Sequence, residues 1–550
     1  MKFKTVYNLV SAYIWGDQLT KLLWQTYEDR LILLKRLVNH QTVTNTEGEL
    51  TFPSFIKQLL LQIPYFEKNQ SQILLETTED NKEAVVAFYK APTTTKTIVL
   101  ISHFDTVDVD DYGSFREDAF DPDKLKYDFT QYSSYLSTDA IEDLKNDTYL
   151  FGRGVMDMKA GLMLHLSLIE LASIEVWDIN LILVTVPDEE VNSSGMRKAV
   201  ETIASIKQTF QLDIQLHLNS EPTFQQASAD EQHYIYSGSI GKIMPGVLCY
   251  GKETHVGNPL DGLSSNFMMS YMNQAIEYNH LFKEEFENET TPLPVSLMTK
   301  DIKQTYDVQT PFRTMGLYNM FLFKQKPADL YRQFIDTVIR ATERCESDWL
   351  KILENEDIEF ETKINVLTFD QLKQYAIKHY GESRIDKEIQ QVIKETPGLH
   401  MQSIRVTDRL MQICRNIAPA VVTFFATPYY PAVNVSYDQK IEETIALVKE
   451  TFEEKFQCQS KRIHYFNGIS DSSYLNFAGD MSQMITYEKN TPNFNATYTI
   501  PFEAIKEISA PTLLCGPIGK DAHKVSERLH KKSAFEELPF VLEKLIKSYI

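Results

Sequence analysis

The sequence has little cysteine and no long hydrophobic run. Its five cysteines are scattered singly and never form a Cys-x-x-Cys pair. An odd number of widely spaced cysteines fits neither a disulfide framework nor a thiolate zinc site. The longest apolar stretches, such as residues 181–186, are far shorter than the roughly 18 residues that a membrane-spanning helix needs. We therefore expect inert thiols and no membrane partner.

Positive charge is also scarce. Lysine and arginine total 55 against 76 aspartate and glutamate residues, which gives a formal net charge of −21. Such a surface repels phosphate backbones and anionic lipids, so no nucleic-acid partner is expected. The chain begins with a basic tip, but the apolar patch behind it is interrupted and no small-residue cleavage site follows. We interpret residues 1–19 as the first helix of a cytoplasmic protein.

The order of the predicted elements indicates an α/β domain interrupted by an insertion. Up to residue 235, helical segments alternate with strand-like runs at 97–102, 181–186 and 213–218, as in a parallel or mixed sheet covered by helices. Residues 236–432 change to a Gly-rich start and charged helical segments. Residues 433–550 return to the α/β pattern after an amphipathic helix.

Polar residues follow these predicted strands. His103 and Asp105 come directly after the run at 97–102, and side chains two residues apart on an extended chain point to the same side. One can bind a metal while the other accepts the second ring N–H of the histidine. A polar loop without a ligand is the alternative. Glu189 and Glu190 follow the run at 181–186 and could equally form a solvated acidic turn.

Two further carboxylates fit the same pattern. Asp157 lies among glycines before a helix, where a capping aspartate is the alternative. Glu221 follows the run at 213–218. Because ligands of open α/β sheets bind beyond the carboxyl ends of the strands, these groups should meet. Nitrogen and hard oxygen ligands without thiolates suit two divalent ions that share a bridging carboxylate. Among the 12 histidines, His523 is the best candidate for the missing ligand.

Other hydrolytic chemistries find less support. A two-metal phosphoesterase would suit such ligands, but the sequence has no phosphate-binding loop of the G-x-x-x-x-G-K type. A serine hydrolase is disfavoured because no G-x-S-x-G elbow occurs.

Six motifs make the sequence resemble the co-catalytic zinc exopeptidases and amidohydrolases, a family that includes aminoacylases, glutamate carboxypeptidase and succinyl-diaminopimelate desuccinylase. They occur in order along nearly the whole chain: SHFDTVD (102–108), GRGVMDMKAG (152–161), VPDEE (186–190), NSEP (219–222), GKETHVGNPLDG (251–262) and GPIGKDAHKVSE (516–527). The wording PDEEVNSSG and GISDSSY resembles the subgroup of the arginine-utilisation protein RocB.

The resemblance implies a zinc-exopeptidase-like fold. Residues 1–235 and 433–550 would form a three-layer α/β/α catalytic domain. Residues 236–432 would form an inserted α+β, ferredoxin-like lid that also mediates homodimer formation. An extra helical segment at 350–420 exceeds the usual lid, and the sequence assigns it no role.

The resemblance also implies residue roles. One metal would be held by His103, Asp157 and Glu221, and the other by Asp157, Glu190 and His523, so that Asp157 is the bridge. Asp105 would orient His103, and Glu189 would be the general base. His255 matches a lid histidine that, in dimeric members, reaches the partner's site and stabilises the oxyanion. A surface-loop histidine is the alternative for His255. The implied ions are zinc, with cobalt or manganese as alternatives.

The implied activity is two-metal hydrolysis of an amide bond in a small N-acyl amino acid or short peptide, in arginine or other amino-acid catabolism. The alternative is a non-catalytic metal- or ligand-binding protein that keeps the fold. One departure concerns the substrate carboxylate, because residues 468–473 replace the family's G-T-D-A-R and lack its arginine. Arg313, Arg405 or Arg409 could supply a carboxylate clamp, and the sequence does not select one.

Overall fold

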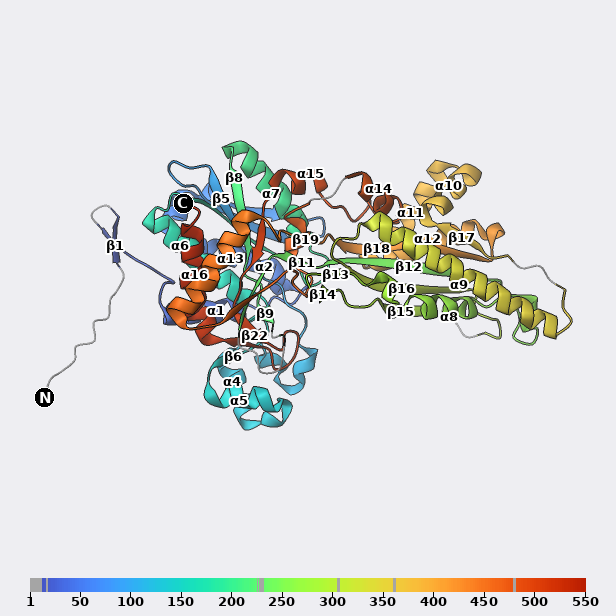
Figure 1. Cartoon of the computed structure of the whole chain (residues 1–550), viewed down its shortest axis with the longest axis horizontal. Helices are drawn as coiled ribbons and strands as arrows, with labels where there is room; N and C mark the ends of the chain where they lie inside the picture. The colour runs from blue at the N-terminus through green and yellow to red at the C-terminus, as the bar shows by residue number, and fades with distance from the viewer. Residues whose placement is uncertain are drawn as a thin grey trace. The chain divides into compact units, whose positions relative to one another are not determined.

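The computed structural model describes residues 12–15, 18–224, 226, 232–303, 307–359, 363–477 and 481–550. The chain forms two compact units (Figure 1). Unit 1 comprises Met1–Ser239, Asn434–Phe477 and Glu503–Ile550, and unit 2 comprises Ile240–Val433 and Ala478–Phe502. The chain leaves unit 1 after β11 (Gly238–Ser239) and first returns to it at β19 (Val433–Asn434).

Residues 478–502 belong to unit 2, whereas the sequence pattern predicts them in the second part of the catalytic domain, at 433–550. Polar contacts within unit 2 explain this placement. The Asn493 side chain lies 2.8 Å from the hydroxyl of Ser403, and the Tyr498 hydroxyl lies 2.9 Å from the backbone nitrogen of Tyr429. These partners are distant in the sequence, so no local sequence pattern predicts that residues 478–502 belong to unit 2.

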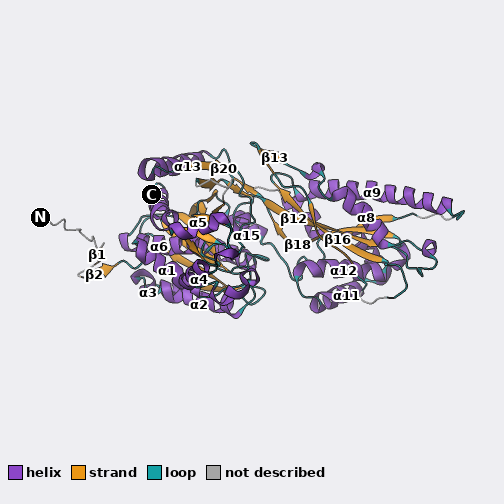
Figure 2. Ribbon diagram, turned by 90° about the horizontal axis from the view of Figure 1, so that it is seen from below, coloured by secondary structure: helices purple, strands orange, loops and turns teal. Residues whose placement is uncertain are grey.

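Unit 1 is built on an eight-stranded mixed sheet of order β20-β10-β21-β8-β5-β7-β4-β3 (Figure 2). Its strands are β3 (Ile73–Thr77), β4 (Glu83–Tyr89), β5 (Lys96–His103), β7 (Asn180–Val186), β8 (Asp213–Asn219), β10 (His233–Tyr236), β20 (Ser460–Ile463) and β21 (Thr512–Leu514). The central strands β7, β5, β8 and β21 run parallel to one another. Strand β7 is buried throughout, as expected of a parallel strand covered on both faces.

Helices cover both faces of this sheet. Leu181 and Leu183 of β7 join a hydrophobic core with α1 (Tyr27–Asn39), α2 (Glu47–Leu60), α6 (Lys159–Glu175), α13 (Gln439–Thr451) and α16 (Leu538–Lys547). On the opposite face, α7 (Ser194–Phe210) packs against β4 and β7, where Phe210 meets Phe88. Side chains alternate between the two faces because the strand period is two. The expected α/β class is confirmed.

Shorter elements complete unit 1. A four-stranded sheet has the order β6-β23-β22-β9. The remaining elements are α3 (Pro64–Lys68), α4 (Pro122–Gln131), α5 (Thr138–Asn146), β6 (Tyr149–Phe151), β9 (Thr223–Phe224), α15 (Phe502–Ile508), β22 (Ile518–Lys520) and β23 (Arg528–His530).

The expected first helix at residues 1–19 is wrong where the structure describes the chain. Strands β1 (Ala12–Trp15) and β2 (Gln18–Lys21) pair antiparallel there. Tyr13, Ile14 and Trp15 belong to the residue types that favour strands over helices. Residues 1–11 and 16–17 lie outside the described residues.

Unit 2 contains a five-stranded sheet of order β15-β16-β12-β18-β17. Its strands are β12 (Gly241–Tyr250), β15 (Val295–Asp301), β16 (Arg313–Leu322), β17 (Asn365–Thr368) and β18 (Ala420–Tyr430). Figure 2 shows α8 (Ser265–Ile276) and α9 (Pro327–Asn355) on one face of this sheet and α11 (Glu382–Glu395) and α12 (Leu399–Ile413) on the other. The hairpin β13 (Glu285–Phe286) and β14 (Glu289–Thr290), α10 (Phe369–Tyr380) and α14 (Met481–Lys489) complete the unit.

The extra helical segment at 350–420 covers one face of the unit 2 sheet. Apolar residues of α10, α11 and α12 form one core with Leu248 of β12, Leu317 of β16 and Val422 of β18. Without these helices, that apolar sheet face would be exposed to water. The segment is therefore an integral layer of unit 2.

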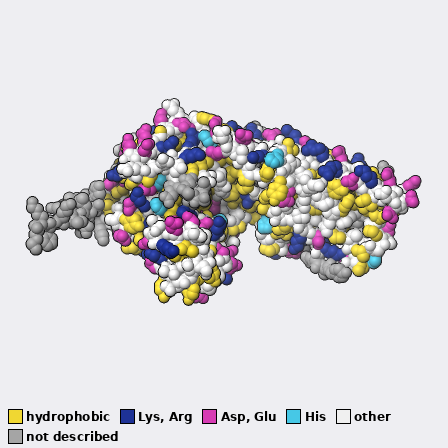
Figure 3. Space-filling view, turned by 60° about the horizontal axis from the view of Figure 1, so that its bottom comes forward, with side chains coloured by type: hydrophobic (Ala, Val, Ile, Leu, Met, Phe, Trp, Pro, Cys, Tyr) yellow, Lys and Arg dark blue, Asp and Glu magenta, His cyan; other side chains and the backbone are white. Residues whose placement is uncertain are grey.

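Within the described residues, we find no helix with the length and hydropathy needed to span a membrane. On the face drawn in Figure 3, lysine and arginine side chains are interspersed with aspartate and glutamate.

Replacing Gly161 with alanine should destabilise unit 1. Gly161 lies in the first turn of α6, where an added Cβ would stand 2.7 Å from the backbone oxygen of Ser220. Because that contact is with backbone, we expect a loss of about 1–3 kcal/mol in the free energy of unfolding. Urea denaturation followed by circular dichroism measures it. Glu201→Ala, at an exposed position of α7, is the control and should change the free energy by less than about 0.5 kcal/mol. Equal stability of both variants would contradict the close packing.

Candidate metal centre

Three parallel strands of unit 1 deliver polar residues to the same edge of the sheet. Strand β5 ends at His103, and Asp105 follows it. Strand β7 ends at Val186, before Glu189 and Glu190, and β8 ends at Asn219, before Glu221. Because β5, β7 and β8 are parallel neighbours, their carboxyl ends meet.

Asp157 lies between two histidines. Its Oδ1 atom is 3.1 Å from Nε2 of His103, and its Oδ2 atom is 3.4 Å from Nε2 of His523. The same His523 nitrogen lies 3.1 Å from Oε2 of Glu190. Ligand atoms of His103, Asp157 and Glu190 all lie within 4.8 Å of one another. A carboxylate that turns one oxygen toward each histidine has the geometry of a bridge between two ions.

Glu221 and Glu189 lie on the His103 side of the cluster. Nε2 of His103 is 4.0 Å from Oε1 of Glu221 and 3.9 Å from Oε2 of Glu189. Glu189 is only 7% exposed, and its Oε1 atom has no hydrogen-bond partner among the described residues. A buried carboxylate oxygen without a donor is costly, so this atom fits a site that receives a cation, water or substrate.

Asp105 connects His103 to the turn that carries Glu189 and Glu190. Its carboxylate accepts hydrogen bonds from the backbone N–H groups of Glu189 at 3.1 Å and Glu190 at 3.3 Å. Its Oδ1 atom also lies 3.6 Å from Nδ1 of His103. Nδ1 of His103, the ring nitrogen that faces away from Asp157, lies closer to the backbone oxygen of Asp105, at 3.1 Å, than to its carboxylate. The expected role of the Asp105 carboxylate in orienting His103 stays a prediction. No sequence pattern predicts the hydrogen bonds between Asp105 and the turn that carries Glu189 and Glu190.

A buried ion pair that the sequence did not reveal fixes the same turn. Nζ of Lys82 lies 2.7 Å from Oδ1 of Asp188 and 3.3 Å from Oε1 of Glu49. Oδ2 of Asp188 accepts a hydrogen bond from the backbone N–H of Ser194. The turn is thus not a solvated acidic loop. Lys82 and Glu49 belong to distant segments, so nothing at their own positions marks them as partners.

The pKa shifts of the cluster reflect the burial of several carboxylates close to one another. Burial and the nearby carboxylates of Asp471 and Glu190 raise the pKa of Glu189 well above its usual range. Burial would lower the pKa of His103, but Glu189, Asp105 and Asp157 outweigh it and raise that pKa. Hydrogen bonds to Asp157 and Glu190 raise the pKa of His523 to about 10. The carboxylates of the cluster thus favour positive charge at both histidine positions.

Asp471 was noted in the sequence only as part of a departing motif. It is 1% exposed, and burial raises the pKa of its carboxyl to about 7. Its negative charge is among the causes that raise the pKa values of Glu189 and Glu221. A buried aspartate in this loop therefore belongs to the electrostatics of the cluster.

The donor set fits divalent ions. It combines imidazole nitrogens with carboxylate oxygens, and none of the residues in the cluster is a cysteine. Such ligands suit zinc, cobalt or manganese rather than metals that prefer thiolates.

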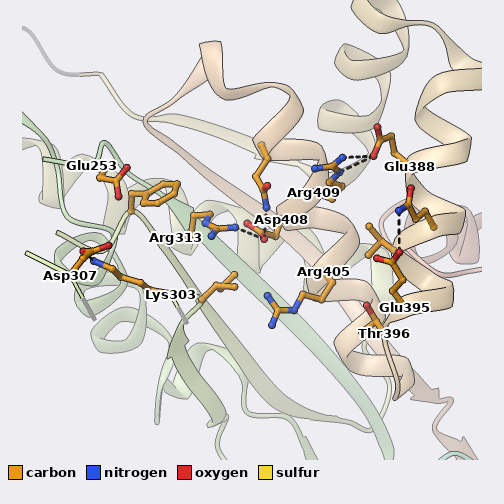
Figure 4. A pocket seen from close by; sticks show the side chains of 15 residues that line it. Glu253, Lys303, Asp307, Arg313, Glu388, Glu395, Thr396, Arg405, Asp408 and Arg409 are labelled. Atoms are coloured by element: carbon orange, nitrogen blue, oxygen red, sulfur yellow. Dashed lines mark hydrogen bonds and ion pairs between the residues drawn. The ribbon is translucent and has the colours of Figure 1, made fainter. Parts of the chain in front are cut away.

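The remaining predicted residues lie in unit 2. His255 has an exposed ring, whose Nδ1 atom accepts a hydrogen bond from the backbone N–H of Gly257. Its expected catalytic role stays a prediction. Arg313, Arg405 and Arg409 all line one pocket of unit 2 (Figure 4).

Metal binding should strengthen as pH rises toward 10. The pKa of His523 is raised to about 10, so its ring is protonated at neutral pH in the metal-free protein. Only the neutral imidazole is a ligand, so binding must release that proton. Zinc titration calorimetry between about pH 6 and 9, in buffers of different ionisation heat, measures the release. His523→Gln should bind fewer ions and release fewer protons, whereas the exposed His379→Gln should match the wild type. An affinity independent of pH would contradict the prediction.

Comparison with known proteins identifies similar chains. A family model described as "Peptidase family M20/M25/M40" matches residues 99–548. The "Uncharacterized protein YqjN" of Bacillus subtilis is 36% identical over 528 residues, which cover 94% of this chain and 96% of YqjN. "Protein RocB" of the same organism is 28% identical over 562 aligned residues, which cover 97% of this chain and 98% of RocB.

A solved structure shares the fold. The M20 family metallo-carboxypeptidase Sso-CP2 from Sulfolobus solfataricus matches with a TM-score of 0.54 and 12% identity. The match covers 94% of this chain and 99% of Sso-CP2.

Proposed function

The chain belongs to peptidase family M20/M25/M40, as its six motifs predicted, and we propose that it is a two-metal hydrolase of small N-acyl amino acids or short peptides. Membership of this family makes it a hydrolase that acts on amide bonds. The observation that carries the two-metal proposal is Asp157, whose two carboxylate oxygens face His103 and His523. The proposed role in the catabolism of arginine or another amino acid rests on the resemblance of the motifs PDEEVNSSG and GISDSSY to the arginine-utilisation subgroup.

The proposed ligand assignment is the one that the motifs imply, and the distances within unit 1 are compatible with it. His103, Asp157 and Glu221 would hold one ion, and Asp157, Glu190 and His523 the other. Zinc is the first candidate for both positions, with cobalt or manganese as alternatives. When bound, such ions lower the pKa of water and polarise a scissile carbonyl.

Glu189 is the proposed general base. It is buried beside the ligands, and its Oε1 atom has no partner among the described residues that would compete for a proton. That oxygen would take a proton from the attacking water and pass it to the departing amine. Asp105 would keep the base in place, because it accepts the backbone N–H of Glu189.

Glu189→Gln should abolish turnover but leave metal binding intact. The amide keeps the shape of the side chain but cannot accept the proton, so we expect a fall in kcat of about 10²–10⁴-fold. The assay is hydrolysis of a panel of N-acyl amino acids and dipeptides after loading with zinc, cobalt or manganese. Metal content is measured on the same samples by mass spectrometry.

The control is Glu201→Gln, which makes the same chemical change at an exposed position of α7. Full turnover by Glu189→Gln with its metals bound would refute the base assignment. A wild type that binds metals but hydrolyses nothing in the panel would instead favour a binding protein that keeps the fold.

We further propose that His255 acts in trans within a homodimer. The ring is exposed on unit 2, so it is available to another chain. An exposed donor that reaches the partner's site could stabilise the oxyanion, and its loss should lower kcat by about 10²–10³-fold. His280→Ala, at another exposed histidine of unit 2, should leave kcat unchanged.

Mixing two inactive variants tests the trans arrangement. A heterodimer of His255→Ala and Glu189→Gln chains would contain one site with both groups intact. Random pairing should therefore restore about a quarter of the wild-type activity. Sedimentation that shows only monomers at micromolar concentration, or no recovery in mixed dimers, would remove the trans role.

A further inference from the structure

A buried ion pair in unit 1 lies close to the segments that carry the proposed metal ligands. Nη1 of Arg153 is 2.6 Å from Oε2 of Glu527, and the two side chains are 1% and 0% exposed. Oε1 of Glu527 accepts a hydrogen bond from the backbone N–H of Gly154 at 2.7 Å. The backbone oxygen of Glu527 accepts another from the N–H of Gly152 at 3.1 Å. Glu527 therefore binds the loop at residues 152–157 through its side chain and its backbone.

This contact joins two loops that each carry a ligand of the proposed second ion, the one assigned to Asp157, Glu190 and His523. Asp157 follows Gly154 by three residues and ends the loop at 152–157, which we call the Asp157 loop. His523 precedes Glu527 by four residues in the turn at 521–527, which we call the His523 turn. The distance between these two ligands thus depends on how closely the Asp157 loop and the His523 turn approach each other.

The His523 turn has a backbone conformation that needs support. Asp521 and His523 have φ angles of 57° and 62°, in the left-handed region that residues other than glycine rarely adopt unless surrounding contacts hold them there. Among the described residues, the remaining hydrogen bonds and ion pairs of 521–526, apart from those of His523 itself, join members of the segment 521–528 to one another. Glu527 is therefore the residue that ties this turn to the Asp157 loop.

Arg153 extends the connection to the segment that follows β5. Its Nη2 atom lies 2.9 Å from Oδ1 of Asp111, and its Nε atom donates a hydrogen bond to the backbone oxygen of Asp108 at 3.2 Å. Asp108 follows the proposed ligand His103 by five residues. A guanidinium has five N–H donors in a rigid, planar fork, so one arginine can hold several segments in fixed positions.

Stability alone is a weak reason to bury such a pair. Removing two charges from water costs free energy that their attraction repays only in part, and a well-packed apolar pair of similar volume is often as stable. An ion pair with two hydrogen bonds does, however, fix distance and direction, which apolar contact does not. Residues that orient metal ligands without touching the ion affect its affinity by about 10–100-fold when they are changed.

We propose that Arg153 and Glu527 are positioning residues for the second ion, because they hold the His523 turn against the Asp157 loop. This inference rests on the proposed two-metal centre and adds residues that contact neither ion nor substrate. The first ion, assigned to His103, Asp157 and Glu221, should depend little on the pair. His103 ends β5 and Glu221 follows β8, so the central sheet holds these two ligands independently.

Calorimetric titration of the full chain with zinc tests the pair. Glu527→Gln should bind the first ion within about twofold of the wild type and the second about 10–100-fold more weakly. The titration is run at pH 8, because burial raises the pKa of Glu527 to about 7 and the ion pair needs the ionised carboxylate. The variant should fold, since Arg153 keeps its ion pair with Asp111, and circular dichroism checks this.

The matched control is Glu537→Gln. Glu537 is 2% exposed and lies 2.9 Å from Nε2 of His233, so the same chemical change removes an equally buried ion pair of unit 1. This control should keep both zinc affinities within about twofold. Arg153→Lys is a second test that keeps the buried charge. Its single ammonium group cannot reproduce the guanidinium fork, so the second ion should again be the one that binds more weakly.

A double variant separates positioning from general loosening of unit 1. His523→Gln removes a ligand of the second ion directly, so adding Glu527→Gln to it should leave the affinity of the remaining ion unchanged within about twofold. A further loss would overturn the positioning role. So would wild-type affinity for both ions in Glu527→Gln, or equal weakening in Glu537→Gln. A wild type that binds fewer than two zinc ions would overturn the two-metal proposal itself, and this inference with it.

Discussion

The burial of like charge at one edge of the unit 1 sheet is the constraint on which the surrounding structure depends. Asp105, Glu189 and Glu221 are all less than a tenth exposed, and Asp157 lies among them. Carboxylates so close together repel one another unless cations or N–H donors offset the charge. The raised pKa values of the two histidines beside Asp157 show that positive charge at their rings offsets this repulsion. Divalent ions would do so more effectively, which is why this geometry favours a metal centre over a proton-filled cluster.

The scaffold around the cluster keeps flexible side chains from relieving that repulsion by moving apart. Asp105 accepts hydrogen bonds from the backbone of Glu189 and Glu190, in the turn that follows β7. The buried ion pair between Lys82 and Asp188 fixes the same turn. On the other side, α6 packs against Ser220 so closely that Gly161 has no room for a Cβ atom. Glu221 follows Ser220 directly, so the close approach of α6 also fixes the backbone that presents this carboxylate. Preorganisation of this kind would let the same atoms bind ions and substrate without rearrangement.

Local patterns predicted the parts of the fold that are encoded locally. The β5, β7 and β8 runs are short and apolar, and the polar residues that follow each strand are neighbours in the sequence, so the sheet edge and its cluster could be expected. Lys82 and Glu49 could not, because each looks like an ordinary charged residue until the fold brings it to Asp188. The first described residues were predicted as helix although they pair as β1 and β2, since a short segment leaves periodicity ambiguous.

The extra helices of unit 2 have two faces with different physical requirements. Their apolar face covers the sheet, and this alone accounts for the presence of Ile404 and Leu410 in α12. It does not account for Asp408, which is almost wholly buried and yet uses only one of its carboxylate oxygens. That oxygen accepts from Arg313 of β16 at 2.9 Å and from Gln412 of α12. The ion pair therefore connects α12 to the strand beneath it and fixes the position of the helix on the sheet, which apolar packing alone would leave free to slide.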